Sequence, residues 1–258
     1  MKNMITLNTR KTLITLLSLI ILLPYLSISL LGQTPTAQQI LERIDRNQSA
    51  DSRIFTASMI IHAQRGERTM EMKIWSVGNQ KSFTEYLAPA REKGTKMLKL
   101  ADQLWMYSPS ADRTIQISGH MLRQSVMGSD LSYEDMMDDQ RLTDNYDAQV
   151  VGPDTLGGRD CWVLELRARS TDLAYQRRKM WIDRERYVPL KEELYAKSGK
   201  LLKQTLLSDV KLIDGRWFPT RVVYQDMLKL GGGTEFVIHE IRFNVPIAES
   251  TFNKSMLK

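Results

Sequence analysis

The sequence predicts a mainly β protein with few helices, in which an antiparallel sheet is strongly curved or closed into a barrel and helices cover its concave face. Apolar segments of strand length follow one another between residues 53 and 243, and turn-forming pairs such as Gly78-Asn79 and Asp214-Gly215 separate them. Parallel strands would need long crossovers, which these short gaps do not allow. A sheet of about twelve strands curls or closes, because large flat sheets are rare.

The first 32 residues differ in kind from the rest. Lys2, Arg10 and Lys11 give a positive start without an acidic residue, and residues 12–31 are almost uncharged. This pattern predicts a signal peptide over residues 1–32 and export to the periplasm. Because the apolar run is long, an uncleaved membrane anchor is the alternative. Removing these residues lowers Lys and Arg from 36 to 33, against 30 Asp and Glu, a balance that does not favour nucleic-acid binding.

One domain is expected over residues 33–258, and it begins with an amphipathic helix over residues 34–50. Pro35 suits the first helical turn behind Thr34. The apolar residues that recur at helical spacing are Ala37, Ile40, Leu41 and Ile44. Such a helix needs an apolar surface to cover.

Two runs of strands flank a central insert. The first run is expected at residues 53–64, 68–77, 81–87, 95–100, 104–107 and 113–117, and the second at 146–152, 161–168, 175–182, 188–197, 200–213, 217–228 and 234–243. Pro153-Asp154 and Gly157-Gly158 are interpreted as turns, and a short C-terminal helix is expected to dock Phe252. Charges in the middle of strands, as in residues 190–197, argue against a barrel that faces lipid.

The insert, residues 118–140, is expected to form a lid of loop and short helix. It is rich in methionine, whose flexible thioether adapts to irregular apolar surfaces. A tight turn precedes a short acidic helix with Asp130 or Ser132 as its N-cap. The candidate lid residues are Met121, Met127, Gly128, Ser129, Asp130, Tyr133 and Met136. An ordinary filled core beneath them is the alternative to a ligand cavity.

The sequence offers little chemistry. It has no nucleophile elbow, no P-loop and no zinc-ligand spacing, and its three histidines lie far apart. The acids of residues 134–139 lack calcium-loop spacing and are interpreted as a solvated helix face. Cys161 is the only cysteine, so no internal disulfide forms, and a small buried residue is expected there. We therefore expect no enzyme, no metal and no cofactor.

Ordered motifs across residues 52–252 resemble the LolA-like family of outer-membrane lipoprotein-sorting proteins. The most specific is the run MGSDLSYED at Met127–Asp135, and DGRWFPT at Asp214–Thr220 is less specific. The further matching segments are Leu87–Thr95, Leu104–Pro109, Arg113, Gln124-Ser125, Trp181–Asp183, Pro189–Lys191 and Gly199-Lys200.

The resemblance implies a periplasmic, unclosed barrel whose apolar concave face receives the acyl chains of a lipoprotein or lipid. It also implies an RND- or MMPL-type inner-membrane transporter as a partner, and a non-enzymatic accessory module that docks on such a transporter is the alternative function. A monomer is expected. The candidate ligand-binding residues, chosen because they cluster around the insert, are Trp75, Met97, Trp105 and Tyr107.

Overall fold

The structure is a computed structural model that describes residues 34–63, 66–137 and 141–258. The chain divides into two units, Met1–Pro35 and Thr36–Lys258. The predicted signal peptide, residues 1–32, lies outside the described residues, and the helices and strands described all belong to the second unit. Within the described ranges, no helix is both long and apolar enough to cross a membrane.

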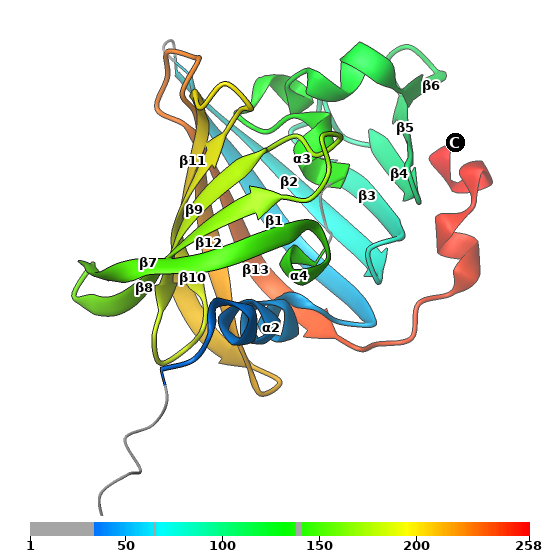
Figure 1. The fold of residues 1–258 in the computed structure, drawn as a ribbon. Helices are drawn as coiled ribbons and strands as arrows, with labels where there is room; N and C mark the ends of the chain where they lie inside the picture. The colour runs from blue at the N-terminus through cyan, green and yellow to red at the C-terminus, as the bar shows by residue number, and fades with distance from the viewer. Residues whose placement is uncertain (1–33, 64–65, 138–140) are drawn as a thin grey trace, which may run out of the picture. The chain divides into compact units, whose positions relative to one another are not determined.

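Thirteen antiparallel strands form one sheet, ordered β6-β5-β4-β3-β2-β1-β13-β12-β11-β10-β9-β8-β7. The first six strands and the last seven are two meanders of chain neighbours, and the pairing of β1 with β13 joins them. The edge strands β6 and β7 do not pair with each other over the residues described, so the sheet curls without closing (Figure 1). The sequence-based prediction of a mainly β, unclosed barrel is confirmed.

The strand bounds are β1 Ser52–Ala63, β2 Gly66–Val77, β3 Lys81–Ala88, β4 Lys96–Leu100, β5 Gln103–Ser108, β6 Arg113–Ile117, β7 Tyr146–Leu156, β8 Arg159–Ala168, β9 Arg177–Asp183, β10 Pro189–Tyr195, β11 Leu201–Ile213, β12 Arg216–Asp226 and β13 Thr234–Phe243. Successive side chains of each strand point to opposite faces of the sheet. The inner, concave face and the outer face therefore take alternate residues.

β7 is longer than predicted, because the chain does not turn at Pro153-Asp154. An edge strand tolerates Pro153, whose missing N–H group need not serve a second neighbour. The strand passes a bulge between Val150 and Gly152. The chain reverses at Gly157-Gly158, the second of the two predicted turns, whose left-handed φ values of 56° and 75° suit a tight hairpin.

The N-terminal helix α2 (Ala37–Gln48) begins later than predicted, because Thr36 and not Thr34 is its N-cap. The Thr36 hydroxyl accepts a hydrogen bond from the Gln39 N–H group at 3.2 Å. The Gln39 side chain accepts one from the Thr36 N–H group at 2.9 Å, which completes a capping box. The predicted apolar face is buried, and it covers the inner surface of β7–β9 together with the short helix α4 (Leu142–Asn145).

The lid, defined here as residues 118–137, joins β6 to the second meander and consists of η2 (Gly119–Arg123), η3 (Val126–Gly128) and α3 (Tyr133–Met137). Helix α3 follows Ser132, one of the two predicted N-caps. The Ser132 hydroxyl accepts a hydrogen bond from the Asp135 N–H group at 3.2 Å, and the Asp135 carboxylate accepts one from the Ser132 N–H group at 2.6 Å.

Four apolar cores lie on the sheet in the described residues, the smallest of them around Cys161, Val163 and Trp181. One is on the inner face of β1–β6 and β13, beneath the lid, and a second is on the inner face of β7–β9, beneath α2 and α4. The third lies on the outer face of β2–β5, where the C-terminal turns η4 (Glu249–Phe252) and η5 (Lys254–Leu257) cover it. Phe252 is buried in this third core, as the sequence predicted.

Candidate functional site

A cavity of about 280 Å³ lies between the lid and the inner face of β1–β3, β12 and β13. Its apolar walls are Phe55, Met72, Ile74, Leu131, Met136 and Phe236. The sheet supplies four of these because alternate residues of β1, β2 and β13 point inward, and the lid supplies Leu131 and Met136. The arrangement encloses an apolar space between a sheet and a separate cover.

Polar and charged residues also line this cavity. Ser76, Ser82 and Thr84 lie on β2 and β3, and Asp135 and Tyr224 lie where α3 meets the sheet. Burial, and then the neighbouring Asp135 carboxylate, raise the pKa of Tyr224 above its ordinary value. The Tyr224 hydroxyl therefore stays protonated at neutral pH and adds no charge to the cavity wall.

Asp135 ties α3 to the second half of the sheet. It forms an ion pair with Lys203 of β11 and accepts a hydrogen bond from the Tyr175 hydroxyl. Only 13% of its side chain and 10% of the Lys203 side chain are exposed. Burial alone would raise the pKa of Asp135, but the charge of Lys203 and the donated hydrogen bonds lower it below its ordinary value.

The interpretation of the acidic run as a solvated face is thus wrong for Asp135, which turns inward to meet a buried cation. Glu134 is half-buried, and Asp138 and Asp139 lie outside the described residues. Spacing in sequence did not reveal this partner, because Lys203 is 68 residues away.

Asp130 ties the lid turn to the hairpin that connects β12 and β13. Its carboxylate accepts hydrogen bonds from the Asp226 N–H group at 3.0 Å and from the Thr234 hydroxyl at 2.7 Å. Its own N–H group donates to the Thr234 hydroxyl oxygen at 2.9 Å. Asp130 is therefore an anchor of the lid and not the helix cap that the sequence offered as one of two choices.

Three cations complete the attachment of the lid, and one of them, the buried Lys99 of β4, donates a hydrogen bond to the Met137 carbonyl at 2.9 Å. Lys229, from the hairpin that connects β12 and β13, donates a hydrogen bond to the Ser129 carbonyl at 2.7 Å. Arg68 of β2 donates one to the Met127 carbonyl. Met127 and Gly128 both have left-handed φ values, 51° and 78°, which present that carbonyl to Arg68 and explain the glycine in the motif. The lid is thus held at its rim by polar contacts and underneath by apolar packing.

The four predicted ligand-binding residues lie on opposite faces of the sheet. Met97 points inward and is buried in the core beneath the lid, with Leu104 of β5. Trp75, Trp105 and Tyr107 point outward, where Phe252 covers them. None of the four lines the cavity, and a ligand role for them stays a prediction.

The seven candidate lid residues all belong to the segment that covers the inner core. Met121, Met127, Tyr133 and Met136 pack against that core, and of these Met136 reaches the cavity. Gly128, Ser129 and Asp130 form the turn that the hairpin and Arg68 hold. The lining residues of the sheet were missed, although the alternation of Met70, Met72 and Ile74 with polar residues in β2 was a usable signal.

The remaining chemistry of the described residues is sparse. No group of three or more metal-ligating side chains gathers in them. His62 lies within 3.1 Å of Glu67 and 3.4 Å of Glu235 at the sheet surface. Cys161 is buried, as the sequence predicted, and burial raises the pKa of its thiol, which keeps it unreactive. What the site offers is apolar enclosure.

Comparisons with known proteins agree with the fold. A family model described as "Uncharacterized protein" matches residues 78–258. A DUF1329 family protein from Desulfovibrio piger is 26% identical with a TM-score of 0.78, covering 86% of this chain and 98% of that one. A putative outer membrane lipoprotein-sorting protein domain from Vibrio parahaemolyticus is 26% identical (TM-score 0.75; 86% and 97% covered). A LolA superfamily protein from Nitrosomonas europaea is 27% identical (TM-score 0.72; 86% and 99% covered). No curated protein matches the chain.

Proposed function

Because the chain belongs to this family of uncharacterized proteins and is structurally homologous to LolA-superfamily lipoprotein-sorting domains, we propose that it is a carrier. It shields the acyl chains of a lipoprotein or lipid in the cavity beneath the lid. The fold itself suggests a carrier of the lipoprotein-sorting type. The nature of the cargo, an acylated molecule, and its route between membranes are the part that we propose.

The observation that carries the proposal is an apolar cavity covered by the lid, a separate segment that polar contacts hold against the sheet. Its volume of about 280 Å³ is near the lower end for ligand pockets, which begin at about 300 Å³. A long acyl chain therefore requires the lid to move outward. The polar contacts of Asp130 and Lys229 at the rim of the lid can break and re-form in water, whereas the sheet beneath stays intact.

The energetics suit a carrier without a catalytic group. Each methylene removed from water contributes about 0.8 kcal/mol, so a chain of about 16 carbons gains on the order of 10 kcal/mol before ordering costs. Displacing the lid offsets part of that gain. Cargo is therefore held and can still be released.

The setting of this carrier is also part of the proposal. Residues 1–32 direct export, and residues 33–258 act in the periplasm as a monomer. An RND- or MMPL-type inner-membrane transporter is the proposed partner at hand-over. The accessory-module alternative predicts a docking face at the acidic residues Glu134, Asp135, Asp138 and Asp139. It loses support, because Asp135 is turned inward.

A cavity-filling variant tests the carrier. Ser82 lies on the inner face of β3 and lines the cavity, so Ser82→Trp fills the space without leaving a hole. Leu87→Trp places the same side chain on the same strand where the residue is 40% exposed, and serves as the control. Delipidated wild-type protein and the control bind a fluorescent fatty acid, and Ser82→Trp binds it at least about tenfold more weakly. Stable wild-type protein that takes up neither this probe nor lipid from membrane extracts would overturn the proposal.

A further inference from the structure

A second cavity, of about 440 Å³ and polar in character, adjoins the apolar one. It lies beside the C-terminal end of α2, and Arg53, Gly78 and Asn79 line both spaces. An amphiphile whose chain occupies the apolar cavity can therefore place its polar end here.

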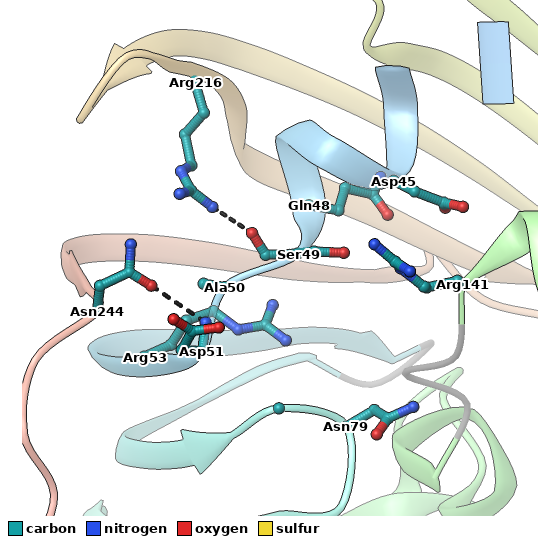
Figure 2. A pocket seen from close by; sticks show the side chains of 11 residues that line it. Asp45, Gln48, Ser49, Ala50, Asp51, Arg53, Asn79, Arg141, Arg216 and Asn244 are labelled. Atoms are coloured by element: carbon teal, nitrogen blue, oxygen red, sulfur yellow. Dashed lines mark hydrogen bonds between the residues drawn. The ribbon is translucent and has the colours of Figure 1, made fainter. Parts of the chain in front are cut away.

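Three arginines from separate parts of the fold line this polar cavity: Arg53 of β1, Arg141 just before α4, and Arg216 of β12. Figure 2 shows the guanidinium groups of Arg53 and Arg141 extending into it from opposite sides. Like charges repel at short range, so an anion between them is electrostatically favoured. Guanidinium groups also bind carboxylate and phosphate oxygens in a planar, bidentate geometry.

The contacts that hold Arg216 in place leave some of its hydrogen-bond donors unused. One of its terminal nitrogens donates a hydrogen bond to the Ser49 carbonyl at the end of α2, as Figure 2 also shows. Its guanidinium carbon lies 4.6 Å from the centre of the Phe243 ring. Its Nε atom is buried without a hydrogen-bond partner. A buried donor without an acceptor costs free energy, which a bound anion would recover.

Two carboxylates, Asp45 and Asp51, lie in the same lining. Asp45 is 5% exposed, and its carboxylate binds the start of α4. It accepts hydrogen bonds from the Leu142 N–H group at 3.0 Å and from the Thr143 hydroxyl at 2.7 Å. Asp51 is exposed, and its N–H group donates to the Asn244 side chain at 3.1 Å. Arg141 and Arg216 thus share this lining with one solvent-exposed carboxylate and with one whose oxygens already accept hydrogen bonds from the start of α4.

We propose that this polar cavity binds the anionic head group, a carboxylate or phosphate, of a lipid whose acyl chain lies in the adjoining apolar cavity. The inference rests on the proposed carrier function and narrows its cargo to anionic amphiphiles. Arg141 and Arg216 supply the head-group contacts, and the opening between the two cavities, lined by Arg53 and Asn79, marks where head and chain meet.

The test compares amphiphiles that differ only in the charge of the head group. Delipidated protein is titrated with oleate and with oleyl alcohol, using wild type, Arg141→Glu and a control, Arg113→Glu, at an exposed arginine on edge strand β6. We expect oleate to bind wild type and the control at least about tenfold more tightly than Arg141→Glu, because that variant loses one charge-assisted contact to the head group. Oleyl alcohol should bind all three proteins alike. Arg216→Lys keeps the positive charge but loses the planar guanidinium group that binds two oxygens at once. We expect it to weaken the binding of oleate by less than Arg141→Glu does, and to leave the binding of oleyl alcohol unchanged.

The outcomes distinguish the head-group site from the carrier function. If oleate and oleyl alcohol bind equally and Arg141→Glu changes neither, the head-group site is wrong and the carrier stands. If neither amphiphile binds wild-type protein, the carrier proposal and the inference both fall. Inorganic phosphate is the third probe: thermal stabilisation of wild type by phosphate, with oleate binding unaffected by Arg141→Glu, would make this a site for a free anion and overturn its role in lipid binding.

Discussion

At the scale of single residues, Asp135 carries the strongest expectation. Replacing it with Asn leaves the ammonium of Lys203 buried without its counter-charge, and we expect a loss of about 2 kcal/mol in the free energy of unfolding. Urea denaturation of Asp135→Asn measures this. The double variant Asp135→Asn/Lys203→Met removes both charges and should recover part of the loss. Equal stability of the single variant and the wild type would show that the pair contributes nothing.

The same carboxylate makes a prediction about pH. Because the folded-state pKa of Asp135 is lowered, its stabilisation is fully present above its unfolded-state pKa of about 3.9 and is lost as pH falls through the folded-state value. The stability difference between wild type and Asp135→Asn should therefore be constant near neutrality and shrink below about pH 4. Denaturant midpoints measured from pH 7 to pH 3 test it. A difference that grows on acidification would contradict this linkage.

Residue faces were the weakest part of the sequence-based prediction. Leu104, Trp105, Met106 and Tyr107 are all apolar or aromatic, so alternation could not reveal which pair faces the concave side. The structure turns Leu104 and Met106 inward and the aromatic pair outward, because the C-terminal segment gives the outer face a core of its own. Where one face is charged, as in β2 from Met70 to Ile74, the inward residues could have been identified.

At the scale of elements, the C-terminal turns are expected to stabilise the sheet from outside. Phe252 is 4% exposed and packs with Trp105, so Phe252→Ala should cost about 3 kcal/mol in the free energy of unfolding and shift tryptophan emission to the red. Met256→Ala, in the same segment but 42% exposed, is the control and should change both quantities little. Unchanged emission in Phe252→Ala would contradict the packing.

Element boundaries followed local chemistry that the sequence contains. The capping box of Thr36 and Gln39 was readable as a pattern, yet Pro35 behind Thr34 offered a competing start for the same helix. Pro153 was interpreted as a turn because proline is rare in strands, and only the position of β7 at the sheet edge makes it acceptable there. Edge position is a property of the whole sheet, so the segment alone could not reveal it.

At the scale of the folded unit, two long-range connections define the architecture. β1 pairs with β13 and so joins the two meanders, and Asp130 of the lid binds Thr234, 104 residues away. Alternation and turns predict hairpins between neighbours, but they carry no information about pairing between distant strands. The number of strands predicted a sheet that curls or closes, and the resemblance to a known family indicated that it stays unclosed.

This architecture predicts where motion is concentrated when a chain enters the cavity. β1 pairs along its length with both β2 and β13, so its amides should exchange slowly with or without ligand. The lid rests on short turns and rim contacts, so its amides in residues 119–137 should exchange faster and become protected when oleate is added. Hydrogen exchange followed by mass spectrometry, with and without oleate, measures this. Ser82→Trp serves as the control, because a filled cavity should abolish the ligand-dependent protection while leaving β1 unchanged. Protection that appears in β1 but not in the lid would mean that ligand enters by opening the sheet, and the lid would then be only a part of the core.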